Sequence, residues 1–308
     1  MTTLPAFPGS TVRSILLASD LSCRSDRALD RALLLARQWQ CALVIVTVID
    51  SAETRHLAPH ERALHQRTAE RRVLSDAGAA DVPITVHVAF GDRVASVLEV
   101  AAQEGCGLIV LGAASHQGMG RMMLGSTIDA LIARAPVPVL AVRQRARQPY
   151  PALVVASDFS PAALHALEHA GRLFPAAALH VFHALEAGPA LGKSGGGAHE
   201  RNERLRQAQA LGDAHLAEAA LSPALRGQVQ FIFREGDAGL LLEAHGQARC
   251  DDLVVLGARP RHRLVNLLIG SVAQRILERT ENDVLSIADP TGVPLAESTP
   301  DARGPARR

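Results

Sequence analysis

The chain contains the same pattern twice, and this duplication constrains its fold more than any other feature. The matching segments are SILLASDLS (14–22) with ALVVASDFS (152–160), HVAFGD (87–92) with FIFREGD (231–237), LIVLGA (108–113) with LVVLGA (253–258), and LGST (124–127) with IGSV (269–272). The last three pairs are 145 residues apart and the first is 138 residues apart, so the second copy has seven extra residues between them. We place this insertion in GPALGKSGGGAHE (188–200) and predict a duplicated domain.

Apolar runs alternate with amphipathic helical stretches in each copy. The predicted strands are 14–19, 42–49, 84–90, 107–111 and 137–142 in the first copy, and 152–157, 178–184, 229–234, 252–256 and 283–287 in the second. Continuous β-branched runs between helices are typical of a parallel sheet that is covered on both faces. We therefore predict an α/β fold of two tandem, doubly wound, five-stranded parallel-sheet domains of the Rossmann-like kind.

The domain boundaries follow from composition. We expect the first domain over residues 1–146 and the second over residues 147–290. Between them, RQRARQPYP (143–151) has the Arg, Gln and Pro content of a linker. The last residues, 291–308, have no periodicity and are rich in Pro, Gly and charge, which predicts a disordered tail.

Charge and cysteine content limit the possible partners and the cellular compartment of the protein. The formal net charge of +1 favours neither nucleic acid nor an anionic membrane as a partner. The four cysteines form no CxxC pair, which favours a reduced, cytosolic compartment over a disulfide framework. The apolar runs are too short to cross a bilayer, and the N-terminus lacks the pattern of a signal peptide. We expect a soluble, cytoplasmic protein.

A glycine-rich segment, LGAASHQGMGRMMLGST (111–127), follows the fourth predicted strand of the first copy. In an open parallel sheet, ligands bind beyond the carboxyl ends of the strands, where the strand order reverses. A helix start offers free N–H groups there, and glycine lets an anion approach the backbone. The segment therefore suits a di- or triphosphate. Its alternative role is a strand-to-helix loop that uses glycine only for its turn.

The spacing of this segment resembles a known signature. Gly112-x2-Ser115-x9-Gly125-Ser126 and Gly257-x2-Pro260-x9-Gly270-Ser271 are similar to G-x2-G-x9-G-[S/T] of the universal stress protein family. The resemblance extends to SILLASDLS, to the Gly-Asp turns and to APVPVLAV, and it covers roughly residues 12–143 and 151–288. The chain is identified by this resemblance as a tandem universal stress protein.

The resemblance implies a set of nucleotide-binding residues in each copy. The strand-end aspartate would contact the nucleoside, the backbone at the end of the second strand the adenine, and the glycine loop with its helix start the phosphates. In the first copy these are Asp20, Val48, Gly112, Ser115, Gly125, Ser126 and Thr127; in the second they are Asp158, Ala184, Gly257, Gly270, Ser271 and Val272. A strand-end aspartate also often caps the next helix, which is the alternative for Asp20 and Asp158.

The two copies depart from the signature to different degrees. The second glycine of the family is Ser115 in the first copy and Pro260 in the second. Serine keeps its N–H, whereas proline has none and fixes φ near −65°. Arg259, Arg261 and Arg263 surround this proline and offer charge in its place, although a solvated loop is the simpler role for them. The first copy is therefore predicted to be the better nucleotide site.

These features predict a cytosolic stress-response regulator that binds ATP with Mg²⁺, mainly in its first domain. We see no catalytic triad and no acidic pair with a positioning rationale, so we predict no enzyme and no catalytic residue. Histidine pairs such as His165 and His169 are interpreted as solvated or packed side chains, with no metal site.

The alternative function is a nucleotide-independent interaction scaffold. Family members commonly pair domains through the last strand, which implies an internal pseudo-dimer of the two halves and leaves a homodimer open.

Overall fold

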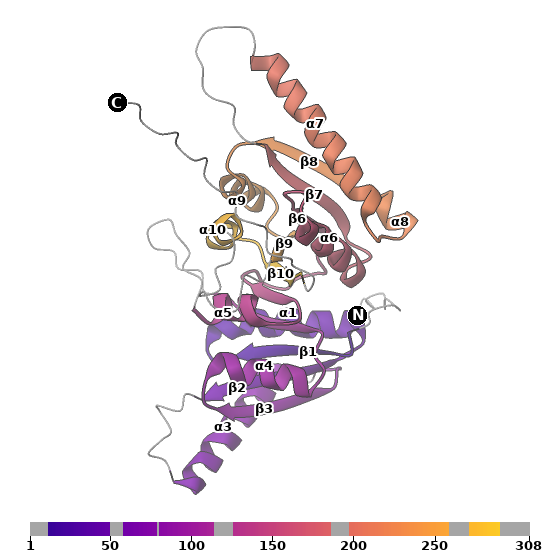
Figure 1. The fold of residues 1–308 in the computed structure, drawn as a ribbon. Coiled ribbons are helices and arrows are strands. Elements are labelled where there is room, and N and C mark those ends of the chain that lie inside the picture. Colours follow the sequence, from indigo (N-terminus) through magenta and orange to yellow (C-terminus); the bar gives the residue numbers. More distant parts are fainter. Residues whose placement is uncertain are drawn as a thin grey trace, which may run out of the picture.

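The protein was analysed as a computed structural model that describes residues 12–49, 58–78, 80–113, 126–185, 197–258 and 271–289. Its two α/β halves lie at opposite ends of the molecule (Figure 1). The predicted disordered tail, most of the predicted insertion and the central part of each glycine loop lie outside the described residues.

Each half has five strands, and all ten predicted strands are confirmed with ends shifted by at most two residues. The first half contains β1 (Ser14–Ser19), α1 (Cys23–Trp39), β2 (Ala42–Ile49), α3 (Pro59–Ala77), β3 (Ile84–Phe90), α4 (Arg93–Gln103), β4 (Leu108–Gly112), α5 (Ser126–Arg134) and β5 (Val139–Val142). The second half contains β6 (Ala152–Ala156), α6 (Pro161–Leu173), β7 (Ala178–Leu185), α7 (Gly197–Glu218), α8 (Pro223–Arg226), β8 (Gln230–Glu235), α9 (Ala238–Ala248), β9 (Leu253–Ala258), α10 (Ser271–Arg279) and β10 (Val284–Ala288).

The strands form one ten-stranded sheet in the order β3-β2-β1-β4-β5-β10-β9-β6-β7-β8. Within each half every strand pair is parallel, as predicted. The two halves meet where β5 runs antiparallel to β10, with Leu140 opposite Leu285. The expected pairing of the halves through their last strands is therefore confirmed.

Alternate residues of the strands build a core on each face of the sheet. On β1, Leu17 belongs to the core under α1, α3 and α6, whereas Leu16 belongs to the core under α4, α5, α9 and α10. Successive side chains of a strand point to opposite faces, so one short apolar run supplies both layers. On helix α1, Ala28, Ala32 and Leu35 lie on one face of the helix, and this face is buried against the sheet.

A buried carboxylate fixes the junction of the two halves. Asp283 directly precedes β10 and is 1% exposed. Its Oδ1 accepts hydrogen bonds from the backbone N–H groups of Arg143 (2.7 Å) and Gln144 (2.8 Å). Its Oδ2 accepts one from the Tyr150 hydroxyl (2.6 Å) and lies 3.4 Å from Nε of Arg31 on α1. One side chain of the second half thus holds a helix and the connecting segment of the first half.

The connecting segment is partly buried, although its composition indicated a simple linker. The Arg31 guanidinium lies 3.9 Å from the ring centre of Tyr150 and donates to the carbonyl of Gln148. The Arg143 guanidinium donates to the carbonyl of Leu277 (2.6 Å). Burial lowers the pKa of Arg143 to about 10, against the opposing effect of Asp283. The segment therefore works as a structural part of the junction.

Three histidines of the second half are neutral, of which His215 is buried and His169 and His180 are half-buried. Burial is the largest cause of the lowered pKa of His169 on α6, His180 on β7 and His215 on α7. The neighbouring charges of Asp252, for His180, and Glu218, for His215, oppose this effect. Within the described part of the chain, Nδ1 of His180 and Nε2 of His215 have no hydrogen-bond partner.

We predict that Asp283→Asn lowers the free energy of unfolding by about 3–5 kcal/mol, because it leaves the buried Arg31 guanidinium without its charge partner. Urea unfolding followed by circular dichroism measures this change. Asp251→Asn, at an exposed carboxylate in the turn before β9, is the matched control and should change stability by less than about 0.5 kcal/mol. Equal effects of the two substitutions would contradict the assigned role of Asp283.

We also predict that acid destabilises the protein through the buried histidines. The folded protein holds their pKa values below the ordinary 6.5, so the unfolded chain takes up protons first as the pH falls. Their contribution to stability is complete above pH 6.5 and is lost below it. Urea midpoints should therefore be lower at pH 5.5 than at pH 7.5, and His215→Gln should reduce this difference. His65→Gln, on the exposed part of α3, should leave it unchanged.

Candidate functional site

The strand order reverses between β1 and β4 in the first half, which defines the candidate edge. After β1 the chain enters α1 on one face of the sheet, and after β4 it leads to α5 on the other face. The β1–β4 register pairs Ala18 with Leu111, so Asp20 and Gly112 emerge at the same carboxyl edge. This is the place where open parallel sheets bind ligands.

Asp20 closes the turn between β1 and α1. Its Oδ1 accepts hydrogen bonds from the Ser22 backbone N–H (3.0 Å), the Ser22 hydroxyl (2.6 Å) and the Ser25 hydroxyl (2.8 Å). Burial disfavours the carboxylate, but these bonds outweigh it and lower the pKa of Asp20. Asp20 thus holds the turn that leads into α1 without capping an N–H group of that helix in the described residues, and its contact with a nucleoside stays a prediction.

The same strained turn occurs in both copies. Leu21 and Phe159, which follow the two aspartates, adopt φ values of 58° and 57°, in a region that non-glycine residues rarely occupy. The hydroxyl of the preceding serine accepts the N–H of each, at 3.2 Å for Ser19 and 3.0 Å for Ser157. Sequence reasoning missed these serines, although the repeated ASD-x-S pattern contained the signal. Strain that is held in the same place twice indicates a functional edge.

A further pair of side chains supports these turns from the second strand of each copy. The Thr47 hydroxyl donates to the carbonyl of Ser19 (2.7 Å), and His183 Nδ1 lies 2.8 Å from the carbonyl of Ser157. A carbonyl only accepts, so His183 Nδ1 donates its proton in this hydrogen bond.

Val48 and Ala184, the residues predicted to face adenine, follow Thr47 and His183 on their strands. Both are partly buried and pack against the core under α4, α5, α9 and α10. The structure thus places Val48 near the carboxyl edge, in the half that also contains Asp20 and Gly112.

The described ends of the glycine loops match the prediction in the first copy. Gly112 ends β4, and Ser126 and Thr127 open α5. Ser115 and Gly125 lie outside the described residues.

In the second copy, Gly257 has a packing role. A Cβ atom there would lie 2.5 Å from the backbone oxygen of Ala162, so glycine allows α6 to begin directly against β9. Ser271 and the exposed Val272 open α10, whereas Gly270 lies outside the described residues.

One further difference between the copies lies where the second glycine loop begins. The backbone N–H of the buried Asp289 donates to the carbonyl of Ala258. The corresponding residue of the first copy is Gln144.

The Gly-Asp turns have a structural role in both copies. Gly91 and Gly236 adopt φ values of 136° and 133°, which favour glycine. Asp92 then caps α4 through the N–H of Ala95 (2.8 Å), and Asp237 caps α9 in the same way. Asp237 also forms an ion pair with Arg275 on α10 (3.4 Å).

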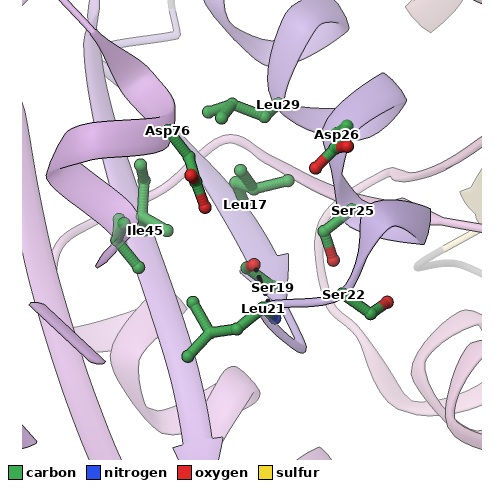
Figure 2. Close-up of a pocket in the computed structure, with 10 residues that line it drawn as sticks. Leu17, Ser19, Leu21, Ser22, Ser25, Asp26, Leu29, Ile45 and Asp76 are labelled. Atoms are coloured by element: carbon green, nitrogen blue, oxygen red, sulfur yellow. Dashed lines mark hydrogen bonds between the residues drawn. The ribbon is translucent and has the colours of Figure 1, made fainter. Parts of the chain in front are cut away.

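A hollow lies beside the β1–α1 turn, on the face of the sheet covered by α1 and α3 (Figure 2). Val46 and Val48 on β2 belong to the opposite face, so the hollow is separate from the position predicted for adenine. Its lining residues are Leu17, Ser19, Leu21, Ser22, Ser25, Asp26, Leu29, Ile45, Val73 and Asp76.

Metal-binding groups and membrane-spanning helices are absent from the described residues. Within those ranges, no group of three or more His, Cys, Asp or Glu side chains has a metal-binding arrangement. His165 and His169 lie together on α6, with ring centres 5.8 Å apart. None of the helices in the described ranges is long and apolar enough to span a membrane.

Comparison with known proteins agrees with the tandem architecture. The model of the universal stress protein family matches residues 11–143 and again residues 149–287. A universal stress protein from Archaeoglobus fulgidus DSM 4304 is 18% identical, covers 90% of this chain and 99% of its own, and has a TM-score of 0.65. A functionally unknown protein from Pseudomonas aeruginosa PAO1 is 22% identical, covers 90% and 93%, and has a TM-score of 0.59.

A universal stress protein in complex with cAMP is 26% identical over 43% of this chain and 98% of its own, with a TM-score of 0.33. None of the curated proteins matches this chain. The family model accounts for both halves of the chain. The chain therefore belongs to the universal stress protein family and contains two copies of its domain.

Proposed function

We propose that this protein is a cytosolic stress-response regulator that binds an adenine nucleotide, ATP with Mg²⁺, at the carboxyl edge of its first domain. The observation that carries the proposal is the meeting of Asp20 and Gly112 at the β1–β4 reversal, with α5 beginning at Ser126 after the glycine loop. Free N–H groups at a helix start stabilise phosphate, and the strand-end carboxylate can accept hydrogen bonds from a nucleoside.

The second domain supports this assignment by contrast. It has Pro260 in its glycine loop and Gly257 committed to the packing of α6. The first difference removes a donor, and the second explains a glycine without a ligand. We therefore assign nucleotide binding mainly to the first domain.

We further propose that binding takes place without efficient turnover. The groups described around the edge, namely Asp20, Thr47 and the turn serines, are engaged in hydrogen bonds that hold the backbone. A general base must instead reach the attacking water. The nucleotide would then act by changing the shape or the partner contacts of the domain.

The first prediction concerns the glycine loop. Gly125→Val should weaken ATP binding by roughly 10- to 100-fold, because a branched side chain before α5 keeps phosphate from N–H groups whose charged hydrogen bonds contribute about 1.5–3 kcal/mol each. Gly270→Val is the matched control in the second domain and should leave the affinity unchanged. Isothermal titration of the full chain with ATP, and with cAMP as a second probe, measures both.

The outcome also separates the two candidate functions. Saturable ATP binding that is lost only in Gly125→Val supports the regulator. Absence of binding at millimolar ATP would contradict it and favour the nucleotide-independent scaffold, for which the continuous ten-stranded sheet offers a rigid platform.

The second prediction concerns turnover. The rate of phosphate release from saturating ATP should equal the background rate measured without protein. Asp20→Asn should not change this rate. Asparagine keeps the oxygen that accepts from Ser22, so the turn is retained while the charge is removed. A rate well above background that falls in this variant would show an enzyme.

A further inference from the structure

Ser25, in the first turn of α1, forms two hydrogen bonds with Asp20. Its hydroxyl accepts the backbone N–H of Asp20 (3.1 Å) and donates to Oδ1 of the same residue (2.8 Å). Ser25 is 7% exposed, so water competes little for these bonds. Figure 2 shows it on α1, beside the turn that contains Leu21 and Ser22. Ser25 therefore holds the backbone and the carboxylate of Asp20 at the same time.

The two oxygens of the Asp20 carboxylate are used differently. Oδ1 accepts hydrogen bonds from the Ser22 N–H, the Ser22 hydroxyl and the Ser25 hydroxyl. Among the described residues, Oδ2 has no hydrogen-bond or ion-pair partner, and Asp20 is exposed. A carboxylate oxygen only accepts, so Oδ2 is available to a donor group of a ligand. The turn thus saturates one oxygen and leaves the other for the candidate edge.

The second copy shows that the backbone of this turn does not need the Ser25 hydroxyl. Ala163 takes the place of Ser25, at the offset of 138 residues. Phe159 nevertheless adopts nearly the same φ as Leu21, 57° against 58°. The N–H of Ser160 also still donates to Oδ1 of the strand-end aspartate, at 3.0 Å. In the first copy, the hydroxyl therefore adds a donor to the carboxylate rather than a support that the backbone requires.

This added donor affects both the charge and the mobility of Asp20. Burial opposes the charged form of the carboxylate, but the hydrogen bonds from Ser22 and Ser25 outweigh it and lower the pKa of Asp20. Donors from two residues also restrict the carboxylate to one orientation. A side chain that is already ordered loses less entropy when a ligand binds. Ser25 thus helps to prepare an ionised acceptor in a fixed position.

We propose that Ser25 is a positioning residue of the nucleotide site, which orients the Asp20 carboxylate so that Oδ2 accepts a hydrogen bond from the nucleoside. This inference rests on the proposed binding of an adenine nucleotide at the same edge. Ala163 has no hydroxyl and cannot act in this way. Ser25 therefore also contributes to the preference for the first domain.

The first test is isothermal titration of the full chain with ATP. Ser25→Ala should weaken binding roughly threefold to tenfold, which is the effect expected when one side chain must be ordered on binding. Ser14→Ala is the matched control and should leave the affinity unchanged. Ser14 is also buried, at 5% exposed, but its hydroxyl donates to the carbonyl of Glu104 (3.0 Å) at the other end of β1.

The second test measures Asp20 without a ligand. Carbon NMR of the full chain with labelled aspartate carboxyl groups follows the titration, and Asp20→Asn assigns the signal. The pKa of Asp20 should be higher in Ser25→Ala than in the unsubstituted chain, because the charged form loses a donor. Ser14→Ala should leave it unchanged. A loss of stability alone would not move the pKa of Asp20 in the folded protein.

The outcomes separate this inference from the proposed function. Weaker ATP binding and a raised pKa of Asp20, both in Ser25→Ala and neither in Ser14→Ala, support the positioning role. If the unsubstituted chain binds ATP and Ser25→Ala binds it equally well, or if the pKa of Asp20 does not change, the positioning role is overturned while nucleotide binding stands. Absence of ATP binding to the unsubstituted chain would contradict the proposed function and this inference with it.

Discussion

The antiparallel pairing of β5 with β10, held by the buried carboxylate of Asp283, is the constraint on which the rest of this structure depends. It joins two five-stranded sheets into one and covers the open edge of each. Because the strands within each half are parallel to one another, the carboxyl edges of the two halves face opposite sides of the joined sheet. The two candidate nucleotide sites therefore cannot share a ligand, and each copy was free to diverge.

The junction also shows how a duplicated interface loses its symmetry. Asp283 corresponds to Pro138 in the first copy, and its partner Arg31 corresponds to His169 in the second. The charged network therefore forms only once across the pseudo-twofold axis. Burying charges is costly unless each is paired and hydrogen-bonded. Here the carboxylate accepts hydrogen bonds from two N–H groups and a hydroxyl, and it forms an ion pair with the Arg31 guanidinium. This arrangement fixes the relative position of the halves more specifically than apolar strand pairing alone.

The same backbone turn supports different chemistry in the two copies. Ser19 and Ser157 hold equivalent strained turns, yet the side chains beside these turns differ. The first copy has the aliphatic Leu21 there, whereas the second has the packed rings of Phe159, His183 and His215. The second copy thus gains aromatic packing and buries a neutral imidazole, at the expense of acid stability.

Duplication and alternating apolar runs were enough to predict the fold, because strand ends and helix faces are local properties of the sequence. The pairing of the halves followed from the family resemblance. The Asp283 network was missed because Asp283 was interpreted only as the start of a strand and RQRARQPYP only as a linker. Nothing local shows that Tyr150 and Arg143 meet a carboxylate more than 130 residues away. The role of Gly257 in admitting α6, and the hollow between α1 and α3, depend on three-dimensional packing that periodicity does not encode.

Native mass spectrometry of the full chain with ATP tests the central claim most directly, because it counts bound nucleotides on each molecule. The account predicts one ATP per chain at concentrations that saturate the first domain. Two nucleotides per chain, with equal affinity, would contradict the division of roles between the copies, and none would contradict nucleotide binding itself.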